Sequence, residues 1–383
     1  MEVIKTLPAI FEEFGEQRRN SFMTAYETKQ KNIPFVGTFC TYTPTEVIMA
    51  AGAIPVGLCS FSDETIADAE QDLPRNLCPL VKSSYGFAKT QKCPYFYFSD
   101  LIIGETTCDG KKKMYEMLGE IKDTHIMELP NRQSPMGRKL WKEEVIALKE
   151  KLEEKFGVTI TEEQLREQVK LSNENRLALR HFYELMKLDP PPMAGLNLYS
   201  VLYGSSFKFN RRQAIDEVKA LTERIQKEYD EGSRPIAKRP RILVTGCPIG
   251  GNAMKVVKSI EENGGNVVCF ENCSGAKSVD ELIDESNPDI YQAIADRYLN
   301  IGCSCMTPDD NRFKLMERLL DEYKIDAVVE VILQACHTYN VESYYIKRFV
   351  TSKGLPYMCV ETDYSAGDIG QLNTRCAAFI EML

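Results

Sequence analysis

Short apolar runs alternate with stretches of helical periodicity in the first and last thirds of the chain. Such runs predict strands buried on both faces, and the periodic stretches between them predict helices that cover those faces. The expected strands span 33–40, 53–59, 95–108 and 125–129 in the first third, and 241–247, 266–273, 326–336 and 355–363 in the last. The pattern therefore predicts an α/β fold with two parallel-sheet domains in tandem.

The middle of the chain has a different pattern. From about residue 134 to 231 the sequence consists of long charged helical stretches without a strand signal, one of them capped by Thr161. Residues 231–240 hold a glycine and two prolines among charged residues, which is typical of a linker. We expect an N-terminal α/β domain with a leading helix, an added helical layer and a C-terminal α/β domain, over residues 1–133, 134–235 and 236–383.

Composition and charge exclude several classes of protein. The 383 residues are 43% hydrophobic and 27% charged, as in an ordinary globular chain. With 47 Lys+Arg against 56 Asp+Glu, the net charge of −9 argues against nucleic acid or anionic membrane as partner. The first twenty residues include acids and no apolar signal-peptide core. The longest apolar run, 47–59, is too short to cross a membrane. We expect a cytoplasmic protein.

Cysteine is the unusual component, with 13 residues against 3 His. Disulfides are rare in a reducing cytoplasm, so the thiols are either small core side chains or thiolate ligands. Their positions favour ligands for six of them, because parallel α/β sheets bind ligands beyond the carboxyl ends of their strands. Four follow predicted strands and two lie in the intervening loops, which gives the matched triples Cys40, Cys78, Cys108 and Cys247, Cys303, Cys336.

The other seven cysteines are assigned differently. Four lie inside predicted strands or the last helix and are expected in the core: Cys59, Cys269, Cys359 and Cys376. The sequence does not decide between ligand and core for Cys93, Cys273 and Cys305. Cys93 and Cys305 are the first candidates to replace a member of the six that is not a ligand. Zinc fits less well, since the chain has no C-x-x-C pair. A [4Fe–4S] cube takes four thiolates, whereas six suit two cubes joined by a shared sulfide.

Glycine-rich segments give no nucleotide fingerprint. Residues 104–112 are similar to a P-loop, but five residues separate Gly104 from Gly110, and lysine stands where Ser or Thr should bind magnesium. The segment TGCPIGG, 245–251, lacks the dinucleotide spacing, so Gly246 and Gly250 are interpreted as letting the backbone approach a ligand closely. ATP chemistry would have to come from a partner.

Candidate proton donors are few. His337 adjoins Cys336, and Glu46, Glu105 and Glu361 lie near strand ends or helix starts. Each could move protons, and each could equally cap or hydrogen-bond a helix start, which is the commoner role of such a histidine. The run 111–113 of three lysines is expected on a solvated helix face, with contact to an anionic substrate or an acidic partner as the second possibility.

Six long motifs together resemble one family. They are GTFCTYTPTEVIMAAGAIPVGL, NLCPLVKSSYG, KCPYFYFSDLIIGETTCDGKKKMYE, TGCPIGG, IGCSCMTP and VILQACHTYNVE. Across essentially the whole chain they are similar to the 2-hydroxyacyl-CoA dehydratase family, which includes benzoyl-CoA reductase subunits, and most similar to its double-cubane cluster proteins. The resemblance implies two Rossmann-like domains facing across a cleft that holds an oxygen-sensitive iron–sulfur cluster. It also implies a separate dimeric ATPase with its own [4Fe–4S] cluster, which supplies low-potential electrons.

The resemblance also implies ligands. Cys40, Cys108 and Cys336 match the cysteines of typical dehydratase subunits, and Cys78, Cys247 and Cys303 are the further set that a double cubane needs. A chain with both sets is expected to form a homodimer and to reduce a small molecule through an [8Fe–9S] cluster. The alternatives are a dehydratase subunit with one [4Fe–4S] cluster, a non-catalytic electron-storage protein and, last, a zinc-stapled binding module.

Overall fold

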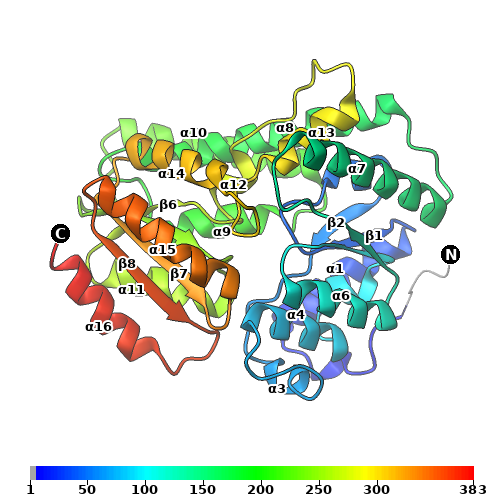
Figure 1. The fold of residues 1–383 in the computed structure, drawn as a ribbon, viewed down its shortest axis with the longest axis horizontal. Coiled ribbons are helices and arrows are strands. Elements are labelled where there is room, and N and C mark those ends of the chain that lie inside the picture. The colour runs from blue at the N-terminus through cyan, green and yellow to red at the C-terminus, as the bar shows by residue number, and fades with distance from the viewer. Residues whose placement is uncertain (1–5) are drawn as a thin grey trace. The chain divides into compact units, whose positions relative to one another are not determined.

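The computed structural model describes residues 6–383. The first five residues, which open the N-terminal stretch considered above for targeting, lie outside it. The chain forms two compact units, each built from three segments (Figure 1). Unit 1 contains the residues up to Ser60, Glu64–Ser172 and Ile283–Asn300, and unit 2 contains Phe61–Asp63, Asn173–Leu282 and Ile301–Leu383.

Unit 1 is built on a four-stranded parallel sheet. Its strand order is β2-β1-β3-β4, and the strands are β1 (Phe35–Thr38), β2 (Ile54–Gly57), β3 (Leu101–Glu105) and β4 (Thr124–Met127). Its helices are η1 (Phe11–Glu13), α1 (Glu16–Gln30), α2 (Thr45–Ala50), α3 (Ile66–Ala69), α4 (Pro79–Lys89), α5 (Pro94–Phe98), α6 (Asp109–Ile121), α7 (Pro135–Phe156) and α13 (Ile290–Leu299). Every residue of the central strand β3 is buried, as a sheet covered on both faces requires.

Unit 2 repeats this topology. Its parallel sheet has the order β6-β5-β7-β8, with β5 (Arg241–Gly246), β6 (Asn266–Phe270), β7 (Ala327–Leu333) and β8 (Tyr357–Thr362). Its helices are η2 (Leu185–Lys187), α9 (Gly195–Ser205), α10 (Arg211–Asp230), η3 (Gly251–Met254), α11 (Lys255–Glu262), α12 (Ala276–Val279), α14 (Asp310–Glu322), α15 (His337–Ser352) and α16 (Ile369–Ile380). Helix α8 (Glu162–Glu184) begins in unit 1 and ends in unit 2. The predicted α/β class with two parallel sheets is confirmed.

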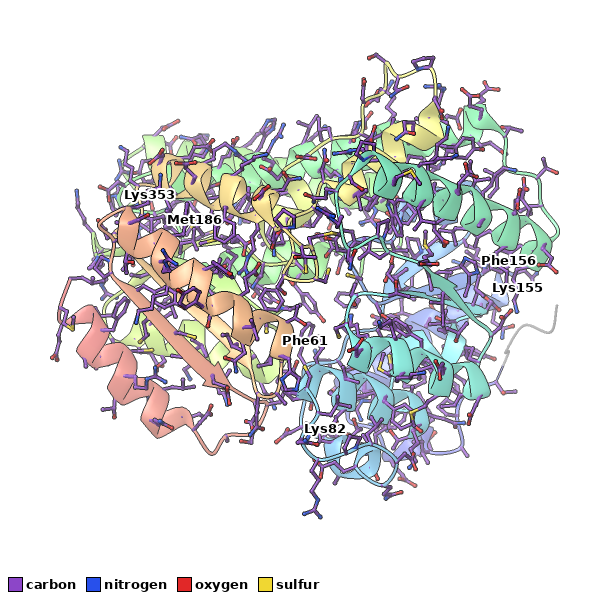
Figure 2. All side chains as sticks on the ribbon, viewed as in Figure 1. Phe61, Lys82, Lys155, Phe156, Met186 and Lys353 are labelled. Atoms are coloured by element: carbon purple, nitrogen blue, oxygen red, sulfur yellow. The ribbon has the colours of Figure 1, made fainter. Side chains whose placement is uncertain are left out.

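Side chains fill the space around each sheet (Figure 2). The two central strands of unit 2, β5 and β7, are buried along their whole length. A buried ion pair lies in unit 1: Lys29 Nζ lies 2.5 Å from Asp100 Oδ2, and Asp100 also accepts the Phe35 amide at 2.9 Å. Within the described residues, no helix is long and apolar enough to cross a membrane.

One strand prediction is wrong in part. Residues 95–98, expected to begin the third strand, form helix α5 because Pro94 occupies its first turn and Cys93 Sγ accepts the Phe96 amide at 3.4 Å. Cys108 is the N-cap of the next helix, α6, which begins at Asp109. The expected cap of α8 is confirmed, since Thr161 Oγ1 accepts the Gln164 amide at 3.2 Å. The three-part division of the sequence stays a prediction.

Candidate functional site

Each sheet has a topological switch point between its two central strands. The chain leaves β1 towards β2 on one side and returns to β3 on the other, and β5, β6 and β7 repeat this path. Open α/β sheets bind ligands at the carboxyl ends of the strands that flank this point. Cys40 and Cys108 follow β1 and β3, whereas Cys247 and Cys336 follow β5 and β7. Both switch points are therefore flanked by cysteines.

In unit 1, two predicted ligands are helix N-caps. Cys78 is the N-cap of α4, with Pro79 at the first helical position, and Cys108 is the N-cap of α6. The partial positive charge of a helix N-terminus stabilises a thiolate over a thiol. Both side chains are half-buried, as is that of Cys40. The fold thus provides three partly accessible sulfur atoms, two of them at helix N-termini.

Lys111 on α6 lies among these thiols. Its side chain is buried, and Nζ donates to the Phe39 carbonyl at 3.0 Å and contacts Cys59 Sγ at 3.7 Å. Burial lowers the pKa of Lys111, but the negative charges of nearby groups, led by Cys59, outweigh it and raise that pKa well above its usual value. The prediction that the lysine run lies on a solvated face is therefore wrong for Lys111, although Lys113 is exposed. The buried face of α6 turns this one lysine inward.

Two buried carboxyl groups also lie in unit 1. Glu105 ends β3 and accepts a hydrogen bond from the Thr43 hydroxyl, while its Oε2 atom has no hydrogen-bond partner. Burial raises the pKa of Glu105 to about 7. Glu46 on α2 is fully buried and accepts the hydroxyl of Tyr298 at 2.8 Å. Glu105 can therefore hold or release a proton near neutral pH.

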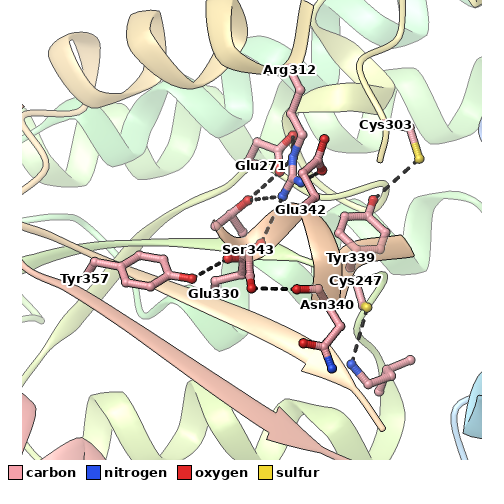
Figure 3. A network of polar contacts seen from close by, with 12 residues as sticks. Cys247, Glu271, Cys303, Arg312, Glu330, Tyr339, Asn340, Glu342, Ser343 and Tyr357 are labelled. Atoms are coloured by element: carbon pink, nitrogen blue, oxygen red, sulfur yellow. Dashed lines mark hydrogen bonds and ion pairs between the residues drawn. The ribbon is translucent and has the colours of Figure 1, made fainter. Parts of the chain in front are cut away.

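In unit 2, the matching cysteines are held by backbone and hydroxyl contacts (Figure 3). Cys247 is buried, and its Sγ accepts the Leu333 amide at 3.3 Å. Cys336 is the N-cap of α15, so it occupies the position that Cys108 has in unit 1. Cys303 Sγ lies 3.6 Å from the Tyr339 hydroxyl. Hydrogen bonds from Cys305 lower the pKa of Cys303 well below its usual value, even though burial opposes the shift.

A buried network of charges adjoins these thiols. Glu271 Oε1 lies 3.0 Å from Lys277 Nζ and 3.4 Å from Arg312 Nε, and all three side chains are fully buried. Arg312 also pairs with Glu342 and Glu330 and lies over the ring of Tyr339, with its guanidinium carbon 5.0 Å from the ring centroid. Figure 3 shows this network around Arg312. The network holds Tyr339, whose hydroxyl meets Cys303.

The remaining cysteines divide into two groups. Cys269 and Cys376 are fully buried, and Cys359 is half-buried within β8. Cys59 and Cys273, by contrast, follow the ends of β2 and β6 and so form a fourth matched pair. Cys59 was expected in the core, yet it donates to the Phe39 carbonyl at 3.0 Å and contacts Lys111. Its place at the end of the predicted strand 53–59, like that of Cys40 at the end of 33–40, was the signal that could have found it.

The surroundings of Gly246, Gly250 and His337 are explained by packing and helix structure alone. Gly246 has a φ of 105°, and a Cβ there would lie 2.2 Å from the Val331 carbonyl oxygen. A Cβ on Gly250 would lie 2.7 Å from the ring of Phe61. Both glycines thus let parts of the protein pack closely, and a ligand contact stays a prediction. His337 is the exposed first residue of α15.

The candidate donors are thiols, the side chains that hold iron–sulfur clusters in proteins. Among residues 6–383, no three His, Cys, Asp or Glu side chains converge as the ligands of one metal ion do. The thiolates of a cluster bind different iron atoms and are held further apart. The surroundings of Lys111 are a second observation. No described carboxylate lies within 4.0 Å of its buried ammonium, and a buried cation without such a partner is suited to a bound anion nearby.

The fold and the strand-end cysteines define a class of two-sheet α/β proteins, and comparison with known proteins identifies the family. Residues 40–383 match the family described as 2-hydroxyglutaryl-CoA dehydratase, D-component. The chain belongs to this family, which confirms the resemblance seen in the sequence.

Individual relatives cover nearly the whole chain. A protein of Escherichia coli (strain K12), provisionally named dehydratase subunit YjiM, is 55% identical over 100% of both chains. The (R)-phenyllactyl-CoA dehydratase beta subunit of Clostridium sporogenes is 25% identical over 97% of both chains. One of the benzoyl-CoA reductase subunits of Thauera aromatica is 19% identical over 89% of both chains. The family thus includes subunits of lyases and of reductases.

Proposed function

We propose that this protein is an iron–sulfur reductase that binds a double-cubane [8Fe–9S] cluster through both cysteine triples. The observation that supports the proposal is a repetition: in each unit, two cysteines of the triple follow the two central strands of a sheet with the same strand order. A chain that needed one [4Fe–4S] cube would need four thiolates, whereas this chain offers matched positions for six.

The cluster would supply electrons at low potential to a small-molecule substrate. The electrons come one at a time from a separate ATP-hydrolysing [4Fe–4S] protein, and a two-electron reduction of the substrate also takes up two protons. The assignment of ATP hydrolysis to a separate protein agrees with the sequence, whose glycine-rich segments do not match a nucleotide-binding motif.

The residues of the chain have distinct roles in this proposal. Cys78, Cys108 and Cys336 are N-cap residues, so the partial positive charge of each helix N-terminus would offset part of the negative charge of a bound cluster. Lys111 offsets part of the negative charge that a cluster would bring into the protein. Glu105 holds a proton near neutral pH because burial raises its pKa to about 7, so it is the first candidate proton donor.

The decisive experiment is an anaerobic count of iron and sulfide with an electron paramagnetic resonance (EPR) spectrum. The loaded protein should hold about eight irons per chain. Replacing one cysteine of either triple, Cys78→Ser or Cys303→Ser, should remove about half of the iron. Cys376→Ala is the matched control, since this thiol is fully buried on α16 and its loss should leave the iron count unchanged.

A dehydratase subunit with one [4Fe–4S] cluster is the second candidate, and the names of the relatives favour it. About four irons per chain in a fully loaded sample, together with binding of an acyl-CoA, would select this candidate and reject the double cubane. About eight irons without turnover of any reducible substrate would leave an electron-storage role. Sedimentation of the loaded protein tests the accompanying proposal of a homodimer.

A further inference from the structure

The two units carry different residues at one matched position. In each unit the third strand is followed by a cysteine that forms the N-cap of the next helix, Cys108 for α6 and Cys336 for α15. The third residue of α6 is Lys111, and the third residue of α15 is Tyr339. A buried cation in unit 1 therefore corresponds to a buried neutral hydroxyl in unit 2.

The charge of Lys111 is not balanced by a salt bridge. Its ammonium donates to the Phe39 carbonyl and contacts Cys59 Sγ, and within the described residues no carboxylate oxygen lies within 4.0 Å of it. The buried carboxyl group of Glu105 interacts with it at longer range, and that group is partly protonated at neutral pH. Most of the positive charge of Lys111 is therefore not neutralised by a carboxylate, and it acts on the thiols of unit 1.

The cations of unit 2 are balanced. Lys277 Nζ lies 3.0 Å from Glu271 and also reaches the Tyr339 hydroxyl at 3.4 Å. Arg312 shares Glu271 and has Glu342 and Glu330 as further partners. The sulfur of Cys303 lies 3.6 Å from the Tyr339 hydroxyl and also has hydrogen bonds from Cys305. Cys303 therefore has a hydrogen-bonding hydroxyl and a lysine that Glu271 neutralises, whereas the lysine of unit 1 has no carboxylate partner.

We propose that this asymmetry directs the first electron to the irons held by Cys40, Cys78 and Cys108. The inference rests on the proposed function, since it requires one cluster bound by both triples. A positive charge stabilises an added electron more than a single hydrogen bond from a neutral hydroxyl does, because the interaction with a full charge is larger and of longer range. The irons on the Lys111 side are reduced first, and those on the Tyr339 side second.

The size of the effect follows from Coulomb's law. At an effective dielectric constant of about 20, a unit charge within about 12 Å of a redox centre changes its reduction equilibrium about tenfold. For a one-electron step, a tenfold change corresponds to a shift of about 59 mV. Removing the charge of Lys111 should therefore lower the first midpoint potential by at least this amount.

The test is a stepwise anaerobic reduction of the loaded full-length protein with a europium(II) chelate, followed by EPR. Lys111→Met should lower the first potential by about 59 mV or more and affect the second less. Lys113→Met is the matched control, because it removes the same charge from an exposed site on the same helix and should leave both potentials unchanged. Tyr339→Phe should lower only the second potential, since hydrogen bonds to sulfur raise the potential of a cluster.

The two variants test the order of reduction independently. An unchanged first potential in Lys111→Met, or a lowered first potential in Tyr339→Phe, overturns the assignment. Should Lys111→Met fail to take up iron, Tyr339→Phe decides alone: an unmoved first potential supports the order, and a lowered one rejects it. Four or fewer irons per wild-type chain would instead reject the proposed function, so the two failures are distinguishable.

Discussion

Glu271 connects two buried cations, and Glu271→Gln tests how far unit 2 depends on it. The substitution keeps the size of the side chain and an oxygen that can accept the hydrogen bond from Thr245, which is 2.6 Å long in the wild type. It removes the negative charge that lies 3.0 Å from Lys277 and 3.4 Å from Arg312. Lys277 then keeps only the Tyr339 hydroxyl among its contacts described above.

The magnitude follows from burial and distance. At an effective dielectric constant of 20, an ion pair at 3.0 Å is worth about 5 kcal/mol before desolvation is counted. Removing one partner of a buried pair costs about 3–5 kcal/mol in practice. Arg312 keeps Glu342 and Glu330, so we expect the low end, a loss of about 3 kcal/mol from the free energy of unfolding.

The pH dependence provides a second measure of the same charge. Burial raises the pKa of Glu271, but Lys277 and Arg312 outweigh it and the pKa is lowered from 4.5. The stabilisation is therefore fully present above pH 4.5 and is lost as the pH falls through the lowered pKa of the folded protein. The difference between wild type and Glu271→Gln should shrink under acid conditions.

Urea unfolding of the cluster-free chain, kept reduced and anaerobic, measures the effect. Circular dichroism gives the unfolding free energy, and hydrogen exchange of the β5 and β7 amides locates the loss in unit 2. Trp141, the one tryptophan of the chain, lies in α7 and reports on unit 1. Glu317→Gln is the control, since its ion pair with Lys353 is exposed and worth under about 1 kcal/mol. An equally small loss for Glu271→Gln at pH 7 would refute the reasoning.

Three further substitutions test other parts of the structure. Because the pKa of Glu105 is raised from 4.5 to about 7, its stabilising effect is lost as the pH rises through that range. Glu105→Gln should therefore reduce the fall in unfolding free energy between pH 5 and 9, measured in urea, by about 3 kcal/mol. Lys29→Met should lower the free energy of unfolding, followed by Trp141 fluorescence, by about 3–5 kcal/mol, because it leaves Asp100 without its buried partner. Adding Asp100→Asn should restore part of that stability, and no recovery would contradict an ion-pair effect. Gly246→Ala should lower Tm through its φ of 105° and the carbonyl 2.2 Å from the new Cβ, whereas Gly370→Ala, with nothing within 4 Å, should not.

Much of the fold follows from local patterns. Six of the eight strands lie within short apolar runs that helical periodicity separates, β4 begins one residue before its run, and β3 lies inside a longer predicted run. The aromatic residues 95–98 misled the prediction, because their β propensity was outweighed by Pro94 and the capping thiol of Cys93. The assignment of α13 to unit 1 was beyond prediction, since packing between distant segments leaves no local pattern.

The site shows the same division. The positions of Cys40, Cys108, Cys247 and Cys336 past strand ends were predictable, because parallel strands end at a common edge. The burial of Lys111 was not, since a run of three lysines is locally typical of a solvated face and only the packing of α6 against the sheet turns one of them inward. Tyr339 gave no signal for the same reason, because its neighbours come from separate segments.

The discontinuity of unit 1 bears on how the chain is made. Helix α13 packs on α7, and the hydrogen bond from Tyr298 to Glu46 joins residues 252 positions apart. A ribosome releases the N-terminal residues first, so this bond forms only after about four-fifths of the chain has been synthesised. Unit 1 therefore lacks α13 until more than half of unit 2 has been translated. A chain cut at 231–240 would lack α13, and a gene fragment ending there should yield a protein that depends on chaperones.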